Sequence, residues 1–354
     1  MVPKICGFPH KPNQPSVTRK LITLRSLFEL GMSQEYQQRL FESFFSVLPG
    51  VSQSTCHQVA AQLLSPRVGE SVKIEPARLQ GSISYTCVAN VPCGGSSRTI
   101  IQFRQEELSL ESMRKAHATH GNVIPPVTFH GRHHWLFVYV SPFAQGEPYI
   151  NTLMSPEGEP PLPHRLRTAV DLASMFVHLC SEDVPRPLDT QSILSNFGIN
   201  SLACETATKQ LIGRSIAIVQ RNIGLIDSLP IVLAHSDLSP FNFLVELTTG
   251  HVTAVLDWSG ATFERVGYNL HFAEHLFGCM TLEGWMDYSD RKAVEERFHS
   301  CLHELLSGQG VDDPEKFLSL VELSKAVGIL HYYVPRMKDD SNRLWEGYLV
   351  SFLK

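Results

Sequence analysis

The sequence predicts an α+β protein, with a small antiparallel sheet in its first half and a mainly helical second part. Two observations carry this prediction. Between residues 71 and 140, short runs rich in β-branched and aromatic residues alternate with Gly, Pro, Asn or Ser, which is typical of strands and turns. From residue 164 onward, long segments carry apolar residues at helical spacing. Strands and helices segregated in this way indicate an α+β fold.

Length and charge restrict the classes of function. With 354 residues, 43% of them hydrophobic, the chain has enough apolar material for a large core. The net charge is −5 and no basic run occurs, so a nucleic-acid partner has no electrostatic support. No apolar run reaches the roughly 20 residues that a membrane span needs, and residues 1–7 lack a signal-peptide layout. We therefore expect a cytoplasmic protein without a membrane partner.

The cysteines and histidines do not indicate a metal or disulfide framework. The eight cysteines are scattered without a C-x-x-C pair, which suits reduced thiols. The His-rich segment 130–134, with His117 and His120 upstream, has no cysteine or carboxylate at ligand spacing beside it. A polar turn between strands is the favoured interpretation of this segment, and a metal site is the alternative.

The residues before the sheet predict an N-terminal helical extension over 1–70. Apolar residues in 16–48 fall at helical spacing with a break near Gly31, and Pro49-Gly50 ends the run. A further short helix is expected over 54–64.

Residues 71–145 predict a small α+β lobe. One helix, over 106–120, interrupts the strands and is closed by Gly121. The expected strands are 71–74, 83–89, 99–104, 127–130 and 135–140.

Residues 146–354 predict a helical lobe that begins with a linker. The composition of 141–163 turns to Pro, Gly and Glu, so regular structure is not expected there. The expected helices are 164–181, 205–226, 269–279, 291–306, 315–333 and 344–353.

One segment inside the helical lobe carries the candidate chemistry. Residues 231–258 predict a short strand, a polar loop, and a β-hairpin that turns at Thr249-Gly250 and ends on Asp257. The loop has the form H-x-D-x-x-x-x-N, with His235, Asp237 and Asn242 at its fixed positions.

Phosphoryl transfer needs the residue types that this segment supplies. A carboxylate orients the nucleophile or accepts its proton, and oxygen ligands hold Mg²⁺ against the nucleotide phosphates. We therefore expect Asp237 to be the base and Asn242 and Asp257 to be metal ligands. Alone, each residue has a simpler interpretation: an acid can cap a loop or helix, and His235 more often holds a loop by hydrogen bonds than catalyses. Their joint spacing favours the catalytic interpretation.

With these motifs the sequence resembles the aminoglycoside phosphotransferase and choline kinase superfamily. The His235 loop is followed, as in that family, by a hairpin and an I-D-W-like acid, here Leu256-Asp257-Trp258. The segment 267–270 and the segment 274–278 look like the fungal-type branch, and the likeness spans about 79–278. The resemblance implies a protein-kinase-like bilobed fold, ATP and Mg as cofactors, and transfer to a hydroxyl of a small molecule.

The resemblance also assigns the nucleotide-binding residues of the sheet lobe. They are Gly81 and Ser82 in a phosphate-covering loop, Gln102 and Arg104 on one face of a strand, and Glu111 on the single helix. Where kinases have a lysine on the third strand, this chain offers only Gln102 and Arg104. Because Arg is a capable phosphate ligand, we expect Arg104 to pair with Glu111 and to reach the phosphates.

Three functions from different classes remain open at this point. An active ATP-dependent small-molecule kinase is the leading one. The missing lysine supports a pseudokinase that binds or scaffolds, and Asp237 would also suit a kinase-like fold recruited to acid–base chemistry. The acceptor and the oligomeric state are left open. Trp258, Trp285 and Tyr268 are candidates for an acceptor pocket, with core positions as the favoured alternative. Acids that could attract a polycation are read mostly as solvated helix faces: Glu264, Glu274, Glu283, Asp287, Glu295 and Glu296.

Overall fold

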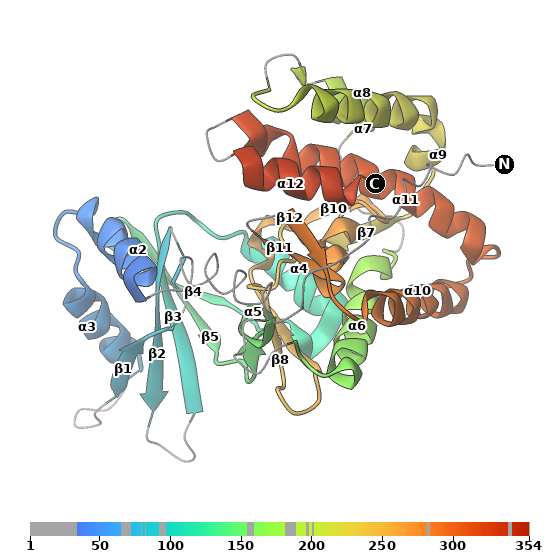
Figure 1. Cartoon of the computed structure of the whole chain (residues 1–354). Coiled ribbons are helices and arrows are strands. Elements are labelled where there is room, and N and C mark those ends of the chain that lie inside the picture. Colours follow the sequence, from blue (N-terminus) through green and yellow to red (C-terminus); the bar gives the residue numbers. More distant parts are fainter. Residues whose placement is uncertain are drawn as a thin grey trace. The chain divides into compact units, whose positions relative to one another are not determined.

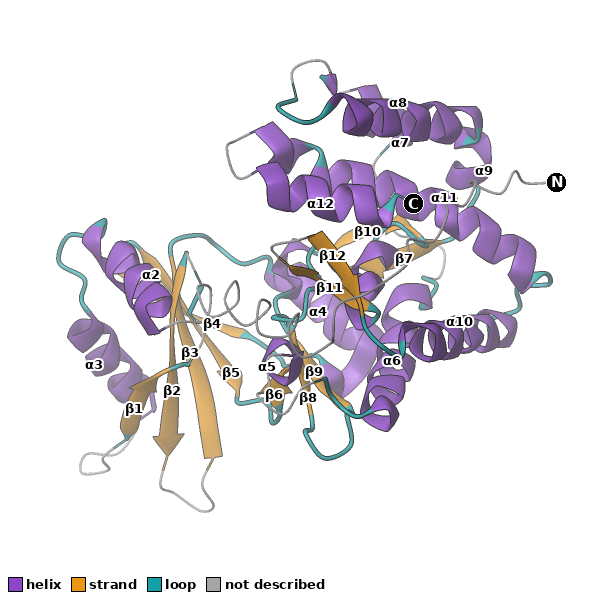
Figure 2. Cartoon of the chain, viewed as in Figure 1, coloured by secondary structure: helices purple, strands orange, loops and turns teal. Residues whose placement is uncertain are grey.

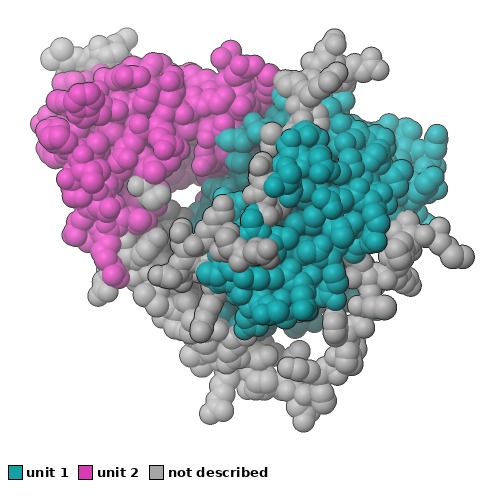
Figure 3. All heavy atoms as spheres, turned by 90° about the horizontal axis from the view of Figure 1, so that it is seen from above, with its two compact units in different colours: residues 1–24, 147–252, 260–354 teal, residues 25–146, 253–259 magenta. Residues whose placement is uncertain are grey.

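The computed structural model describes residues 34–64, 72–78, 80–81, 83–91, 97–153, 159–180, 189–195, 198–199, 202–281, 284–338 and 342–353 (Figures 1 and 2). The first predicted helix, before residue 34, lies outside these residues, as does Ser82. The chain divides into two compact units, coloured in Figure 3. Unit 2 comprises Arg25–Gly146 and the short segment Thr253–Ser259. Unit 1 includes Glu147–Val252 and Gly260–Lys354.

A five-stranded antiparallel sheet forms the centre of unit 2, in the order β1-β2-β3-β5-β4. Each strand predicted between residues 71 and 140 is present, with ends shifted by up to three residues. The strands are β1 (Lys73–Pro76), β2 (Ser84–Val91), β3 (Ser97–Arg104), β4 (Thr128–His133) and β5 (Leu136–Pro142).

Two helices, α2 (Gln34–Ser46) and α3 (Gln53–Leu64), pack on one face of this sheet. The fully buried Ile101 and Phe103 of β3 point to that face and share its apolar core with residues of both helices. Successive side chains of a strand point to opposite faces, so Gln102 and Arg104 lie on the other face of β3. These two helices therefore pack on the face of the sheet opposite to the one that carries Gln102.

The helix α4 (Leu110–His120) begins later than predicted. Ser109 is its N-cap and accepts a hydrogen bond from the backbone N–H of Ser112. The backbone N–H of Leu108 donates instead to the Tyr139 hydroxyl at 2.9 Å, so the residues before the cap stay outside the helix. As predicted, the helix closes at Gly121, whose backbone N–H donates to the carbonyl of His117.

The histidine-rich segment forms the end of β4 and the turn into β5. Gly131 and His134 both have positive φ there, at 102° and 52°. The pairing register shifts between Phe129 and Arg132, which marks a bulge within β4. The polar turn predicted for 130–134 is thus wrong in part, because residues 130–133 belong to β4 and the turn is His134-Trp135.

The predicted linker over 141–163 is wrong in part. Glu147–Pro148 form the short strand β6, which pairs antiparallel with β8 (Phe243–Val245), and α5 (Tyr149–Leu153) follows. Burial explains why these residues form regular structure, because Tyr149 is 2% exposed and stacks on Phe243 with ring centroids 4.9 Å apart. The composition of the segment showed its prolines but not the burial of Tyr149.

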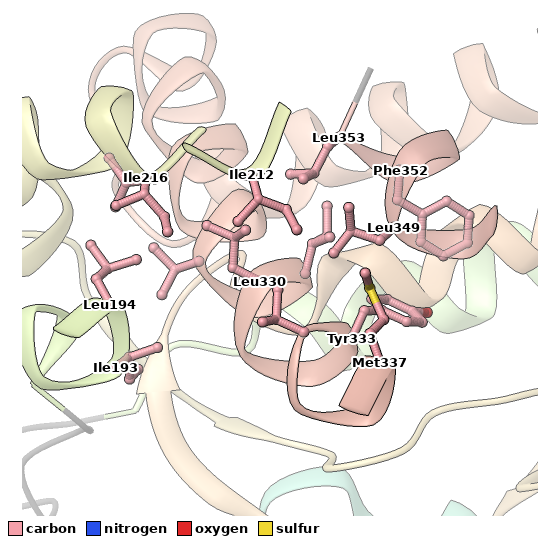
Figure 4. Packing of buried hydrophobic residues seen from close by; sticks show 14 of the residues in the cluster. Ile193, Leu194, Ile212, Ile216, Leu330, Tyr333, Met337, Leu349, Phe352 and Leu353 are labelled. Atoms are coloured by element: carbon pink, nitrogen blue, oxygen red, sulfur yellow. The ribbon is translucent and has the colours of Figure 1, made fainter. Parts of the chain in front are cut away.

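Helices make up most of unit 1 and enclose its main core. The helix α10 packs along α6, while α11 lies against five other helices. Figure 4 shows the apolar side chains between α11, α12 and α8. The helices are α6 (Leu162–Val177), α7 (Thr190–Ser195), α8 (Thr206–Arg221), α9 (Ile223–Asp227), α10 (Arg291–Gly308), α11 (Pro314–Tyr333) and α12 (Asn342–Phe352).

Two predicted helices of this unit need correction. The one over 205–226 is two helices that break at Asn222, whose side-chain amide donates to the carbonyl of Ile218. The one over 269–279 is a 3₁₀ segment, η4 (Leu270–Leu276), followed by β11 (Gly278–Thr281), which pairs with β12 (Gly284–Asp287). At Gly278 a Cβ would lie 2.6 Å from the Met286 carbonyl oxygen, so the backbone of β12 approaches closely at this glycine. Pairing with β12, rather than helical spacing, therefore determines the conformation of this segment.

One helical stretch of the described chain, Pro314–Met337, is long and apolar enough to cross a membrane by length and composition. Of its most apolar window, 44% is buried inside the structure. Its buried residues, such as Leu330 and Tyr333, belong to the core shown in Figure 4, which explains the apolar composition without a membrane.

Candidate active site

The loop after β7 (Ile231–Ala234) is held by buried residues of unit 1. His235 is 1% exposed, and its Nδ1 accepts a hydrogen bond from the backbone N–H of Asp237 at 3.0 Å. Leu238 is buried behind the loop, and the carbonyl of Pro240 accepts from the backbone N–H of Ile150 at 3.0 Å. His235 therefore shapes the backbone at Asp237, in agreement with the loop-holding interpretation.

Asp237 and Asn242 lie together in this loop. The Asn242 side-chain amide donates to the backbone carbonyl of Asp237 at 2.8 Å and approaches its Oδ2 at 3.3 Å. Both of these partners are acceptors, so the NH₂ group of Asn242 must face Asp237 and its Oδ1 must point elsewhere. The loop thus fixes a carboxylate next to an outward-turned amide oxygen.

A third residue, Tyr332, reaches the same carboxylate from helix α11. Its hydroxyl donates to Asp237 Oδ1 at 3.3 Å. Burial, followed by the charge of Asp237, raises the pKa of Tyr332, so its hydroxyl keeps its proton at neutral pH. No signal in the sequence marks this residue, because it is 95 positions from Asp237 and lies in an ordinary apolar helix pattern.

The position of Tyr332 depends on a close approach of two backbones. A Cβ at Gly328, one turn earlier in α11, would lie 1.7 Å from the carbonyl oxygen of Tyr268. Only glycine allows this contact, because any side chain would displace the helix or the segment before η4. The ring of Tyr332 also packs on His271 and Phe272 of η4. The helix that carries Tyr332 is therefore docked on the segment that follows β10 (Thr262–Arg265), the partner strand of β7.

Buried ionic groups fix η4 to its neighbours. Glu274 is 8% exposed and accepts from Lys325 of α11 at 2.7 Å and from Arg291 of α10 at 3.2 Å. Burial acts to raise the pKa of Glu274, but the two cations outweigh it and leave that pKa lowered. Burial also lowers the pKa of His271 to about 3 and that of His275 to about 4. Both histidines are therefore neutral in the folded protein at physiological pH.

The predicted hairpin is present between β8 and β9 (Val252–Val255). It turns at Thr249-Gly250, where Gly250 has a φ of 72° and its backbone N–H donates to the carbonyl of Glu246 at 2.8 Å. A Cβ on Gly250 would lie 2.3 Å from the backbone oxygen of His164, so both conformation and space require glycine here.

Asp257 follows this hairpin, in the segment that belongs to unit 2. Its φ is 58°, in the left-handed region that non-glycine residues rarely adopt, and the Ser259 hydroxyl donates to its Oδ1 at 3.0 Å. Strained backbone of this kind persists where the surroundings fix it, and it gathers at functional sites. Trp258, next to it, is fully buried and packs on His120 with ring centroids 5.0 Å apart, so it is a core residue.

Three other predicted residues of unit 2 are Arg104 and Gln102 on β3 and Gly81 before β2. Arg104 is 8% exposed and its Nε has no hydrogen-bond partner among the described residues. Gln102 is half-buried on the same face, opposite Thr86 on one side and Tyr139 on the other. Gly81 lies in a tight turn before β2, where a Cβ would meet the Ser84 hydroxyl at 2.8 Å. A glycine at this turn therefore follows from local packing as well as from a phosphate-covering role.

The predicted pairing of Arg104 with Glu111 is wrong. Glu111 is exposed in the first turn of α4 and pairs with Lys115, one turn along its own helix, at 2.6 Å. The Lys115 hydrogen bond, with its charge, lowers the pKa of Glu111. An i,i+4 partner on the helix surface was available without any tertiary contact, whereas Arg104 is buried on the sheet.

Two of the acids read as solvated are in fact buried, namely Glu264 at 2% and Glu274 at 8% exposure. Among the residues that the structure describes, no group of three or more His, Cys, Asp or Glu side chains is placed to hold a metal ion. The aromatic candidates Tyr268 and Trp285 pack against the helical core of unit 1, which agrees with the core interpretation.

Comparison with known proteins agrees with the motif. Residues 107–270 match the family model described as phosphotransferase enzyme family. Comparison with curated protein sequences finds no match.

Solved structures with a similar fold include aminoglycoside and choline kinases. A GDP complex of a mutant aminoglycoside 2'-phosphotransferase-IIIa matches with a TM-score of 0.52 and 13% identity, over 84% of this chain and 95% of that one. A choline kinase from Cryptosporidium parvum Iowa II matches with a TM-score of 0.53 and 10% identity, over 85% of this chain and 94% of that one. A choline/ethanolamine kinase family protein from Mesorhizobium loti matches with a TM-score of 0.51 and 13% identity, over 84% and 92%.

These matches confirm two of the predictions from sequence. The chain resembles the aminoglycoside phosphotransferase and choline kinase superfamily, and its fold is the predicted kinase-like α+β fold. At these identities the structural likeness shows the fold alone.

Proposed function

We propose that the chain is an ATP-dependent phosphotransferase that acts on a hydroxyl of a small molecule. The observation that carries this proposal is the loop of unit 1, where the Asn242 amide and the Tyr332 hydroxyl contact the carboxylate of Asp237 and His235 accepts from its backbone N–H. A carboxylate contacted by two side chains on a fixed loop is suited to align an acceptor hydroxyl and accept its proton.

The reaction follows from this role of Asp237. The acceptor oxygen forms a bond to the γ-phosphorus of ATP, the bond between that phosphorus and the ADP oxygen breaks, and the hydroxyl proton passes to Asp237. Tyr332 and Asn242 each donate to one oxygen of the Asp237 carboxylate. Each of these oxygens has a second lone pair with which it would accept from the acceptor hydroxyl. Orientation is the main contribution of the protein, because phosphoryl transfer requires little covalent chemistry from side chains.

The donor set fits magnesium. Mg²⁺ prefers carboxylate and carbonyl oxygens, and Asn242 turns its amide oxygen away from Asp237 because its NH₂ group is engaged there. Ser259 donates to Oδ1 of Asp257, and within the described residues no hydrogen bond to Oδ2 is found. Asn242 and Asp257 would hold the ion, which when bound neutralises phosphate charge.

Nucleotide binding in unit 2 would depend on Arg104 and Gln102. Arg104 has an unsatisfied Nε in a buried position, and an unpaired buried donor costs free energy unless a partner satisfies it. A phosphate oxygen would be such a partner, and Arg binds phosphate by geometry as well as charge. The pairing with Glu111 is not required for this role.

A pseudokinase remains the second candidate, because Gln102 stands where a cation is expected and Glu111 pairs elsewhere. We place either activity in the cytoplasm, where ATP is available. The six cysteines within the described residues are free thiols, four of them buried, as a reducing compartment favours.

The test is a calorimetric titration with Mg-ATP followed by ADP release in the presence of small hydroxyl compounds. Asp237→Asn should lower turnover by at least about a hundredfold and leave Mg-ATP affinity within a few-fold, because the acid acts on the acceptor. Asp257→Ala should abolish the magnesium dependence of ATP binding, and Asn242→Ala should weaken it less.

Two outcomes would contradict the proposal. Equal ATP binding by the unmutated protein with EDTA would remove Asn242 and Asp257 from metal binding and favour the pseudokinase. Unchanged turnover in Asp237→Asn would favour a different chemistry for the loop.

A further inference from the structure

An arginine with open donors lies beside the catalytic loop of unit 1. The guanidinium carbon of Arg336 is 3.7 Å from the ring centre of Tyr332, the residue whose hydroxyl contacts Asp237. The same tyrosine ring thus has the candidate base at its hydroxyl and a cation over its face. A single tyrosine side chain therefore links the candidate base and this guanidinium.

Packing holds the guanidinium in place. It stacks on Tyr332, lies 5.8 Å from the ring centre of Trp345 in α12, and donates through Nη1 to the backbone carbonyl of Tyr332. Two aromatic faces and one hydrogen bond restrict the rotamers of Arg336, so less conformational entropy is lost when it binds a ligand. The arginine is arranged before a ligand arrives.

No described acid is paired with the charge of Arg336. Within the described part of the chain its side chain forms no ion pair, while other arginines of the unit, Arg165 and Arg291, each have carboxylate partners. Arg336 is exposed, and Nη1 is the guanidinium nitrogen for which a hydrogen bond is found within the described residues. A planar fork of open donors is the arrangement that binds a carboxylate or a phosphate through two parallel hydrogen bonds.

The acids that could attract a cationic acceptor are used elsewhere. Glu274 neutralises Lys325 and Arg291, and Glu346 on α12 accepts from the backbone N–H of Glu205 and from the hydroxyl of Thr208. Glu264 is buried. A positively charged acceptor would therefore meet the Arg336 cation at the loop without a compensating acid from these three residues.

From this arrangement we propose that the acceptor is a small hydroxy compound that also carries an anionic oxygen group, and that Arg336 binds this group. The inference rests on the proposed phosphotransferase function and names its acceptor class. This acceptor class differs from those of the structurally similar proteins, which are phosphotransferases or kinases of aminoglycosides, choline and ethanolamine. Tyr332 would position the base, and Arg336 would select the acceptor.

The experiment uses matched triples of acceptors with Mg-ATP and the full chain. Each triple holds a hydroxy acid, its neutral alcohol and its amine: glycerate, glycerol and 3-amino-1,2-propanediol; gluconate, glucitol and 1-amino-1-deoxyglucitol; 4-hydroxyphenylacetate, 4-hydroxyphenylethanol and tyramine. ADP release above background is measured for each. We expect a hydroxy acid to be the best acceptor, with a kcat/KM at least tenfold above that of its neutral alcohol.

Variants then test whether Arg336 causes the preference. Arg336→Gln should reduce the preference for the acid at least tenfold through KM, and Arg336→Lys should restore part of it, since lysine keeps the charge but not the fork. Arg221→Gln, which removes an exposed arginine at the end of α8, is the control with the same charge change and should leave the preference unchanged. Mg-ATP affinity should stay within a few-fold in all three variants.

The failure of this inference differs from the failure of the proposed function. No Mg-ATP binding by the unmutated protein would refute the phosphotransferase itself. If Mg-ATP binds, the acceptor assignment is overturned when a neutral or cationic member is the better acceptor, or when none of the hydroxy acids raises ADP release. A loss of Mg-ATP affinity in Arg336→Gln would instead assign the arginine to the nucleotide.

Discussion

Two histidines of η4, the buried His271 and the half-buried His275, should make the fold sensitive to mild acid. In the unfolded chain His271 and His275 titrate near pH 6.5. Burial lowers their pKa values to about 3 and about 4 in the folded protein, so between pH 6.5 and 4 the unfolded state binds more protons. Stability must therefore fall as the pH falls through this window.

The size of the loss follows from linkage. Well below pH 6.5 each histidine costs about 1.4 kcal/mol per pH unit, so the pair should remove about 4 kcal/mol between pH 7 and pH 5. That is a large share of the roughly 5–15 kcal/mol by which domains are stable. Carboxylates add little in this window: Glu274, for example, has a lowered pKa, and its stabilising ion pairs are lost only at lower pH.

Urea unfolding, followed by tryptophan fluorescence at several pH values from 5 to 7, measures this loss. His275→Phe should reduce it by about 2 kcal/mol, because His275 is surrounded by Trp285, Tyr348 and Phe352 and a phenyl ring does not titrate. His303→Gln, at an exposed position of α10, should leave the pH dependence as in the parent. If His275→Phe loses as much stability between pH 7 and 5 as the parent, the reasoning is wrong.

Three further predictions concern the site and its support. Tyr332→Phe removes the donor to the candidate base and should lower kcat about tenfold with little change in Mg-ATP affinity, because a hydrogen bond to a charged group contributes about 1.5–3 kcal/mol; an equal fall in nucleotide affinity would argue for a structural role. Lys325→Met leaves Glu274 with a single cation partner and should cost about 3–5 kcal/mol in urea unfolding, whereas a loss below about 1 kcal/mol would show that Arg291 suffices. Arg104→Ala should weaken Mg-ATP binding more than Gln102→Ala does, since charge-assisted contacts are about twice as strong as neutral ones, and a larger loss in the glutamine variant would contradict the role of the arginine.

The sequence predicted features that depend on neighbouring residues. The strand, loop and hairpin over 231–258 formed as expected, because the glycine and proline turns, the apolar runs and the polar loop all lie within a few residues of one another. The strands of the sheet were found for the same reason, since alternating apolar residues at period two indicate a half-buried strand wherever they occur. Asp237 and Asn242 belong to this local class: five residues of loop bring them together.

Tertiary structure decided what depends on distant residues. Tyr332 reaches the Asp237 loop, and Arg336 stacks on its ring, only because α11 docks on the segment at Tyr268, through a backbone approach that Gly328 permits. Helical periodicity reports that α11 is buried but not which residue it faces.

Competing partners explain the errors in the same way. Glu111 had two possible cationic partners, Lys115 on its own helix and Arg104 on the sheet, and it pairs with Lys115. The segment 269–279 has helical spacing, but β12 offers hydrogen bonds that spacing does not reveal. Sequence thus determines local conformation and residue chemistry, while the choice among alternative partners is made by packing, because only the folded chain sets which of them lie within a few ångströms.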